Sequence, residues 1–476
     1  MGCQHTRLGQ RPGDARGVMS TGGAAPSDIA TASRGAHEPR PLVVVGHGPT
    51  SHAFLKSLRL QSPVEYQVTV LCEEPRPAYD RVRLTEYLQD RDSDRRDRMR
   101  LSLVSEAEML GRGVRLVYGR GTAIDRHAKL VTVVTVAGAE EQLPYEVLVL
   151  ATGSSCFVPP VPGLSLPHKA NPLWPDDPAS RPPGVFVYRT IEDLDRLIAA
   201  VERGASKAAV IGGGLLGLEV AGALRDLGLD CCVLESAPHL LSSQLNRAAG
   251  EMLAQKVADL GLTVHTEAVL DEVMLQDGRA SSVRFYAAGA SEPSEVEVQI
   301  VVVAAGVVPR DGLARGCGLA LGRRGGVKVD SGLRSSDPSI FAIGEVAAIG
   351  GDTCYGLWAP GVEQAGALAR VLAEGPGAAR YEGSDLSTDL KLAGVPVAAF
   401  GRDAAFWAER QFDDGAQGVR HEDLYGEEAG VYAALPFSRR QPPARRHPGG
   451  RHAAVRRAAR DLQKRWQSRQ LVARWR

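Results

Sequence analysis

The sequence predicts an α/β protein in which one structural plan occurs twice. The stretches PLVVVGHGPTSHAFL (41–55) and KAAVIGGGLLGLEVAGAL (207–224) each place closely spaced glycines between an apolar run and a helix-like apolar pattern. Each is followed about twenty residues later by a second apolar strand that ends in a glutamate. This order of strand, turn, helix and acidic residue is typical of Rossmann-like dinucleotide-binding domains, so we predict two of them.

The second glycine turn has the regular spacing. Gly212, Gly214 and Gly217 follow G-x-G-x-x-G, in which the first glycine permits the tight turn, the second lets the backbone approach a pyrophosphate, and the third lets the helix pack on the strand. A pyrophosphate would lie at the helix N-terminus, where free N–H groups and the helix dipole favour negative charge. Glu235 ends the next strand, DCCVLES, at the distance expected of a ribose ligand. We predict a dinucleotide site here; a tight turn without ligand is the alternative.

The first turn departs from this spacing at its third position. Gly46 and Gly48 are present, but Ser51 stands where the third glycine is expected. Serine is small, so close packing of the helix on the strand is strained without being excluded. The next strand, YQVTVLCEE, ends in Glu73. We predict a second dinucleotide site, with a strand–turn–helix that binds nothing as the alternative.

Composition limits the class of protein. The 476 residues suffice for two or three domains, and 44% apolar with 24% charged residues is typical of a globular protein. No apolar run has the length of a membrane-spanning helix. The seven cysteines include no C-x-x-C pair, which argues against a disulfide framework and against a zinc site. We therefore expect a cytoplasmic protein without a metal site and with neither membrane nor nucleic acid among its partners.

The two ends of the chain differ from the rest. Residues 1–40 are rich in Gly, Ala, Ser and Arg and lack the apolar core of a signal peptide, so we expect disorder there. Residues 436–476 hold twelve Arg and one Lys against one Asp, a net charge of +12. Such a tail can bind nucleic acid or serve as an interaction tail. The abrupt loss of strand-like alternation and the Arg-, Pro-, Ala- and Gly-rich composition fit a shifted reading frame better, and we assign this tail no function.

The order of the remaining segments indicates that one unit is inserted into the other. A strand pair leads to YEVLVLATG (145–153), and a Pro-rich stretch follows. After the second turn, VEVQIVVVAAGVVPR (296–310) reads as another strand ending in Ala-Gly, and LRSSDPSIFAIGEVAAIG (333–350) supplies a short strand. The predicted organisation is a disordered segment 1–40, a first unit in two parts (41–155 and 301–380), a linker 156–184, an inserted second unit 185–300, a small β-containing segment 381–435 and the tail 436–476.

Several stretches together resemble a known class of flavoprotein. The two turns, the strand ends Ala-Thr-Gly and Ala-x-Gly, and IFAIGE (340–345) resemble the two-dinucleotide flavoprotein reductases. More closely, the chain resembles the N-terminal part of the NAD(P)H-dependent assimilatory nitrite reductase large subunit, through CEEPRPAYDRVRLTEYL (72–88), GLWAPGVEQA (356–365) and STDLKLAGVPVAAFG (387–401). The resemblance covers roughly residues 41–432, and the combination is more specific than any single glycine motif.

The resemblance implies that FAD binds the first unit. FAD would lie along the first turn and Glu73, with Arg81 near its phosphates and flavin. Glu345 stands where such reductases carry an acid that hydrogen-bonds the ribityl chain. Trp358 and its neighbours open a helix whose first turn suits Pro360 and whose N-terminus would favour negative charge at the flavin. The FAD-binding positions implied are Gly46, Gly48, Ser51, Glu73, Arg81, Thr152, Gly153, Gly306, Gly344, Glu345, Pro360 and Gly361.

The resemblance also implies that NADH binds the second unit, with its nicotinamide stacked on the flavin. It would lie along Gly212, Gly214, Gly217 and Glu235. Glu235 would bond the ribose 2′-hydroxyl and repel a 2′-phosphate, so NADPH is expected to be the poorer donor. Hydride transfer needs no side-chain acid or base, and we therefore name no catalytic residue.

The implied function is transfer of hydride from NADH to FAD and of electrons onward to an iron–sulfur and sirohaem nitrite or nitrate reductase. The loop 75–88 contains no Cys, which argues against disulfide-reductase chemistry, and no Cys follows position 354, whereas iron–sulfur clusters need several thiolates. The chain would thus be the electron-input module, with such a reductase domain or a small electron-transfer protein as partner. A free-standing NADH reductase of rubredoxin or ferredoxin type, a non-catalytic pyridine nucleotide sensor, and a homodimer remain open.

Overall fold

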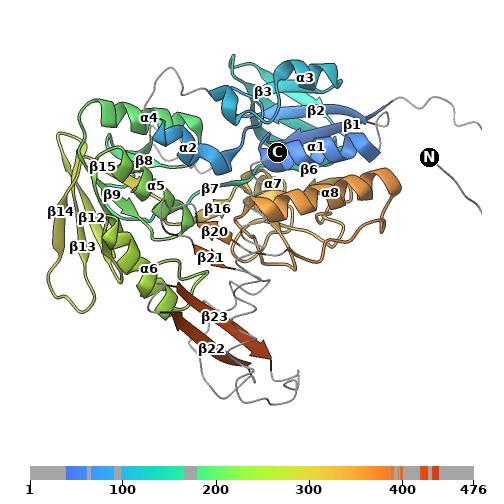
Figure 1. Ribbon diagram of the computed structural model, residues 1–476. Helices are drawn as coiled ribbons and strands as arrows, with labels where there is room; N and C mark the ends of the chain where they lie inside the picture. The colour runs from blue at the N-terminus through green and yellow to red at the C-terminus, as the bar shows by residue number, and fades with distance from the viewer. Residues whose placement is uncertain are drawn as a thin grey trace, which may run out of the picture. The chain divides into compact units, whose positions relative to one another are not determined.

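The computed structural model describes residues 39–61, 66–90, 98–165 and 180–384, together with 386, 388–390, 395, 397–399, 419–426 and 431–438 (Figure 1). The predicted disordered segment up to residue 38, part of the linker (166–179) and the tail from residue 439 onward lie outside the described residues.

The first unit is built on a seven-stranded sheet with the order β18-β6-β1-β2-β3-β4-β5. The first five of these strands pair in parallel, and β4 and β5 extend the sheet in antiparallel fashion. Three neighbouring strands, β18, β6 and β1, read as near-continuous apolar runs because both of their faces are covered. The bounds are β1 (Arg40–Val45), β2 (Tyr66–Cys72), β3 (Arg115–Asp125), β4 (Leu130–Thr135), β5 (Glu140–Pro144), β6 (Val147–Leu150) and β18 (Ile340–Ala342).

Two helices from distant parts of the chain pack side by side against this sheet (Figure 1). They are α1 (Pro49–Gln61) and α8 (Trp358–Glu374). Gly361 permits their contact, because a Cβ there would lie 2.3 Å from Thr50 Oγ1. The smaller elements of the unit are α3 (Glu106–Gly111), η2 (Arg98–Leu101), α7 (Gly312–Gly316), η5 (Gly344–Val346), β17 (Val327–Lys328) and β19 (Ala347–Ala348).

The second unit is built on a five-stranded parallel sheet with the order β11-β10-β9-β15-β8. A three-stranded antiparallel sheet, β12-β13-β14, adjoins it through a shared apolar core. The bounds are β8 (Val185–Val187), α4 (Ile191–Glu202), β9 (Lys207–Ile211), α5 (Leu215–Asp226), β10 (Asp230–Leu234), α6 (Arg247–Asp259), β11 (Thr263–His265), β12 (Val269–Gln276), β13 (Arg279–Tyr286), β14 (Ser294–Glu297) and β15 (Ile300–Val303).

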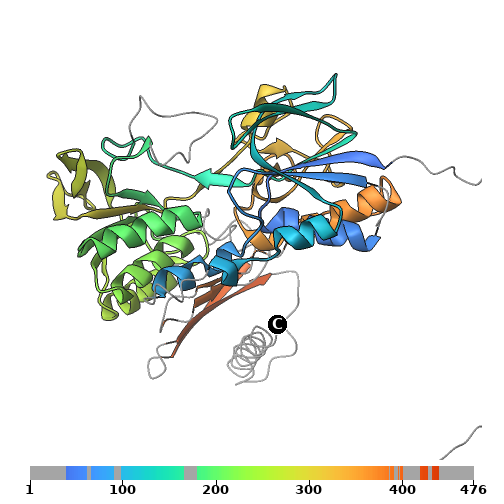
Figure 2. The ribbon, with the colours of Figure 1, turned by 90° about the horizontal axis from the view of Figure 1, so that it is seen from above.

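The boundary predicted at residue 300 falls too early. All four residues of β15 are fully buried between β9 and β8, so the strand belongs to the second unit. After three intervening residues the chain returns to the first unit in β16 (Val307–Pro309). β16 pairs in antiparallel fashion with β7 (Ser154–Cys156), which leads the chain outward. This two-stranded ribbon runs between the two sheets (Figure 2).

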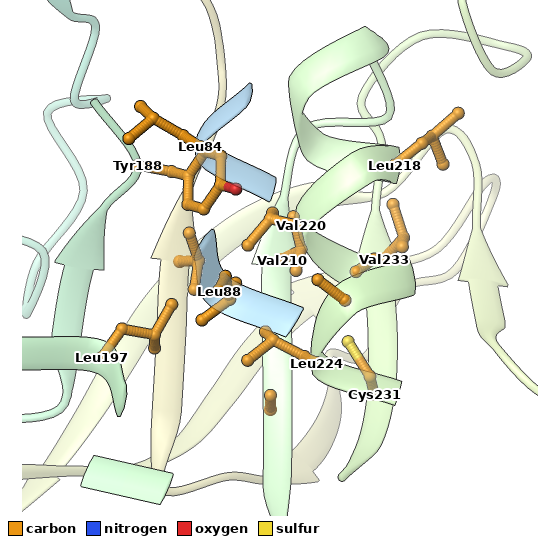
Figure 3. Close-up of a cluster of buried hydrophobic side chains, with 14 of the residues drawn as sticks. Leu84, Leu88, Tyr188, Leu197, Val210, Leu218, Val220, Leu224, Cys231 and Val233 are labelled. Atoms are coloured by element: carbon orange, nitrogen blue, oxygen red, sulfur yellow. The ribbon is translucent and has the colours of Figure 1, made fainter. Parts of the chain in front are cut away.

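One helix of the first part of the chain packs in the core of the second unit. The loop after β2 leads through η1 (Arg81–Arg83) into α2 (Leu84–Gln89). Leu84 and Leu88 are buried in the same cluster as Leu218 and Leu224 of α5, and α2 lies against α4 and α5 (Figures 2 and 3). Burial of a leucine side chain contributes about 2 kcal/mol, so α2 holds the two units together.

Two hairpins follow α8. They are β20 (Thr388–Leu390) with β21 (Val397–Ala399) and β22 (Val419–Gly426) with β23 (Val431–Ser438). β23 continues three residues past the predicted start of the tail at 436, because Pro436, Phe437 and Ser438 still pair with β22. No helix in the described part of the chain combines the length and the apolarity needed to cross a membrane.

Candidate functional site: two glycine turns at one cleft

In the second turn, each glycine has its own structural reason. Gly212 has φ +115°, and a Cβ there would lie 2.4 Å from Ala304 O. A Cβ on Gly217 would lie 2.0 Å from Gly212 O, so α5 could not approach the turn. A Cβ on Gly214, the N-cap of α5, would meet nothing within 4 Å. The N-terminus of α5 therefore opens onto free space, which is the geometry that binds a phosphate group.

The first turn repeats two of these three features. Gly46 has φ +101°, and a Cβ there would lie 2.4 Å from Ala151 O, whereas a Cβ on Gly48 would meet nothing within 4 Å. Ser51 is fully buried at the third position, and its Oγ donates a hydrogen bond to Gly48 O over 3.4 Å. α1 thus tolerates a Cβ where α5 does not. Ser51 is therefore accommodated at this position, and its hydroxyl is satisfied by the turn itself.

The two acidic residues differ in register. The Gly212 N–H donates to Leu234 O (2.8 Å) and the Gly46 N–H to Leu71 O (3.0 Å), so the residue equivalent to Glu235 is Cys72. Glu73 comes one position later. Glu235 folds back on its own turn, where it accepts hydrogen bonds from the N–H groups of Gly213 and Ala237, both over 2.6 Å. Burial raises the pKa of the Cys72 thiol to about 12, so this cysteine stays protonated.

Glu345 lies in a small polar cluster with Ser154 of β7 and with Arg189, which follows β8. The Ser154 Oγ donates to Glu345 Oε2 over 2.6 Å, and the Arg189 guanidinium pairs with the same oxygen. Burial alone would raise the pKa of Glu345, but the charge of Arg189 and the Ser154 hydrogen bond outweigh it and hold the pKa below its usual range. Gly153 completes the cluster, since its Cβ position is 3.8 Å from both charged groups. The carboxylate therefore stays ionised and held in place.

Arg81 connects the first unit to the start of the second. Its guanidinium pairs with Glu74, and its Nη1 donates to Tyr79 Oη (3.0 Å) and to Arg189 O (2.8 Å). Burial opposes ionisation of Arg81, but Glu74 more than compensates, so the pKa of Arg81 is raised. The predicted position of Arg81 near a flavin thus coincides with a junction of the two units.

Twelve of the sixteen predicted site residues line a single cleft of about 1580 Å³. The other four lie behind its wall, where they serve packing: Ser51, Gly217, Pro360 and Gly361. The twelve are Gly46, Gly48, Glu73, Arg81, Thr152, Gly153, Gly212, Gly214, Glu235, Gly306, Gly344 and Glu345. Both turns open onto this cleft, so two dinucleotides bound there would share one space.

Sequence reasoning missed the three cleft arginines that pair with the predicted acids Glu73 and Glu345. Arg189 pairs with Glu345, and Arg120 and Arg310 both pair with Glu73. None of the three stands in a glycine motif. The chain holds 56 Lys and Arg residues, so being an arginine does not by itself mark a residue as part of the site. For Arg310, the nearby strand end VVVAAGVVPR indicated only that the chain returns to the first unit.

Comparison with known proteins agrees with this architecture. The pattern of the pyridine nucleotide-disulphide oxidoreductase family matches residues 40–366. The nitrite reductase [NAD(P)H] large subunit of Klebsiella oxytoca is 41% identical over 362 residues, which cover 76% of this chain and 34% of that protein. The chain thus spans about a third of the length of this relative.

A shorter relative and a solved structure extend the comparison. The nitric oxide reductase FlRd-NAD(+) reductase of Salmonella gallinarum is 30% identical over 314 residues, 66% of this chain and 74% of that protein. The reduced CoADR-RHD protein of Bacillus anthracis has the same fold, with a TM-score of 0.68 at 23% identity over 84% of this chain and 68% of that one. The chain therefore belongs to the pyridine nucleotide-disulphide oxidoreductase family.

Proposed function

We propose that the described part of this chain is an NADH-dependent flavoprotein reductase, which takes hydride from NADH to FAD and passes electrons on to a redox partner. The observation that carries the proposal is the pair of glycine turns opening onto one cleft. Proteins of this family use FAD and NADH or NADPH. Two turns at one cleft match the need to bring two dinucleotides together.

The residues of the first unit fit FAD. The open space over Gly48 and the free N–H groups of α1 suit a pyrophosphate, and Glu73 lies at the same end of the cleft. Glu345, held by Ser154 and Arg189, presents an ionised carboxylate to hydroxyl groups of a ribityl chain. When bound, the flavin accepts two electrons as hydride and can release them singly. The residues named here bind and orient that group and transfer no proton themselves.

The residues of the second unit fit NADH better than NADPH. Glu235 is already oriented by the N–H groups of Gly213 and Ala237, so it can accept hydrogen bonds from ribose hydroxyls and would repel a 2′-phosphate. The cleft residues that follow it are uncharged: Ser236, Leu241, Ser242, Ser243 and Gln244. Among the described residues of this stretch, none offers the guanidinium that a 2′-phosphate requires.

The partner we propose is an iron–sulfur and sirohaem nitrite or nitrate reductase domain, in the cytoplasm. The similarity to the Klebsiella oxytoca nitrite reductase supports this choice of partner. The chain itself has seven cysteines, none after position 354, and reduction of nitrite to ammonia takes place at metal centres that need several thiolates. The metal centres would therefore belong to another domain or chain.

The experiment is a spectroscopic titration of the purified full chain reconstituted with FAD. We expect a yellow protein that bleaches on anaerobic addition of NADH, reduces ferricyanide, and forms no ammonia from nitrite by itself. Protein that remains colourless after reconstitution would reject the flavoprotein assignment. Ammonia formed by this chain alone would reject the assignment as an electron-input module.

A free-standing reductase of a small electron-transfer protein is the second candidate. It is supported by the 30% identity of this chain over 314 residues to the nitric oxide reductase FlRd-NAD(+) reductase of Salmonella gallinarum. The two candidates differ in acceptor. Faster NADH-dependent reduction of a rubredoxin than of separately supplied iron–sulfur and sirohaem domains would favour the free-standing reductase.

A further inference from the structure

Arg310 joins three parts of the first unit at the place where Glu73 lines the cleft. Its Nη1 donates to Glu73 Oε2 (2.6 Å) and its Nε to Ser155 Oγ (2.9 Å). Its backbone N–H donates to Gly153 O (3.0 Å), and its backbone oxygen accepts from Thr152 Oγ1 (2.7 Å). The residue stands directly after β16, where the chain comes back from the second unit. Arg310 therefore reaches Glu73 only once the return strand has paired.

Glu73 is held by two guanidinium groups and still has capacity to bind. Arg120 donates to Oε1 through Nε (3.1 Å) and Nη2 (2.7 Å), and Arg310 donates to Oε2. A carboxylate presents about four acceptor positions, so these three bonds leave about one free. The Glu73 side chain is 33% exposed, and all three residues line the cleft. The arrangement orients the carboxylate without closing it off.

We propose that Arg310 is the positioning residue of the adenosine half of the FAD site. Arg310, together with Arg120, holds Glu73 in the orientation that accepts a ribose hydroxyl. In the second turn, Glu235 obtains the same support from backbone N–H groups of its own turn. In the first turn, Glu73 stands one position later in the strand register than Glu235 does. Its carboxylate is instead held by two side chains, Arg120 of β3 and Arg310 directly after β16. This inference rests on the proposed function, since it assumes that FAD is the ligand.

The inference predicts a loss confined to the adenosine half of the cofactor. In Arg310→Gln we expect FAD to bind about 10- to 100-fold more weakly, because a charged hydrogen bond that orients its ligand is lost. Binding of FMN, which has no adenosine, is expected to stay within about twofold of wild type. Arg310→Lys keeps the charge but loses the planar guanidinium, so its affinity for FAD should lie between those of wild type and Arg310→Gln. Fluorescence titration of the apoprotein measures both affinities.

Arg126→Gln is the matched control. Arg126 also joins the two parts of the first unit, through an ion pair of its Nε with Asp337 Oδ2 (2.8 Å), but it does not line the cleft. We expect its FAD and FMN affinities to equal those of wild type. Equal weakening of FAD binding in Arg126→Gln and Arg310→Gln would mean that Arg310 only stabilises the first unit and does not position Glu73. That result would overturn the inference.

Two further results for Arg310→Gln would also overturn the inference. FAD binding that is unchanged or tighter in Arg310→Gln would mean that Arg310 sequesters Glu73, contrary to the inference. Equal loss of FAD and FMN would place the effect outside the adenosine half and would overturn it as well. If Arg310→Gln does not fold, the ratio of FAD to FMN affinity in Arg310→Lys is the deciding quantity. Failure of the wild-type chain to bind FAD at all would instead reject the proposed function.

Discussion

The two glycine turns share an outline and differ in how their sites are completed. In the second turn, the glycines, the start of α5 and the acidic residue all lie between Gly212 and Glu235, and Glu235 is oriented by backbone N–H groups beside it. In the first turn, Glu73 is oriented by Arg120 and Arg310, which lie 47 and 237 residues away in sequence. One site is thus assembled locally and the other by long-range contacts. The local site is therefore the easier one to predict from a sequence.

The largest expected effect comes from exchanging the third positions of the two turns. Gly217→Ser should lower the free energy of unfolding by roughly 2 to 4 kcal/mol and weaken NADH binding, because its Cβ would lie 2.0 Å from Gly212 O. Ser51→Gly creates no clash, and we expect it to cost no more than about 1 kcal/mol, the usual penalty of glycine within a helix. Urea denaturation of both variants measures the difference. Equal costs would mean that the two turns accommodate a Cβ at the third position equally well.

A smaller effect is expected from the acidic residue of the local site. Glu235→Ala combined with Ser236→Arg should reduce the preference for NADH over NADPH by about tenfold or more, because it removes a repulsive carboxylate and adds a guanidinium. The ratio of kcat/KM values for the two donors measures this change. Glu73→Gln serves as control, since it alters the acid of the other turn and should leave that ratio unchanged. A wild-type chain that is faster with NADPH would contradict the assignment of Glu235.

An effect that is present only at acid pH concerns the middle position of each turn. In the second turn, a Cβ on Gly213 would lie 2.5 Å from Leu240 Cδ2, whereas the first turn accommodates His47. Burial, followed by the nearby His52, lowers the pKa of His47 from 6.5 to about 4. The unfolded chain therefore binds the proton more readily, so stability present above about pH 6.5 is lost as the pH falls toward 4, by at most about 3 kcal/mol.

The measurement is the free energy of unfolding of the FAD-free protein between pH 4 and pH 7. His47→Asn cannot take up the proton and should flatten this dependence. His127→Asn, which changes an exposed histidine in the turn between β3 and β4, should leave it as in wild type. An unchanged pH dependence in His47→Asn would show that the first turn does not bury its histidine.

What could be predicted from the sequence follows the same division between local and long-range contacts. The glycine turns, the strands beside them and the opening of α8 near Trp358 depend on neighbours in sequence, and the structure has them at the expected places. The register of Glu73, its two arginines and the pairing of Arg189 with Glu345 depend on strands that meet only in the fold. The boundary at 300 was misplaced for the same reason, because only the pairing of β15 with β9 and β8 assigns the strand to the second unit.

The position of α2 has a consequence for how the chain folds during synthesis. Leu84 and Leu88 leave the ribosome before residues 185–303, whose core they enter. Chains are made at about 5 to 20 residues per second, so these leucines lack their partners in the second unit for roughly ten seconds or more. The sheet of the first unit waits longer still, since β18 is made after the whole second unit. The apolar side of α2 therefore stays exposed on the nascent chain while the second unit is being synthesised. A chaperone that binds exposed apolar segments would bind α2 during this interval.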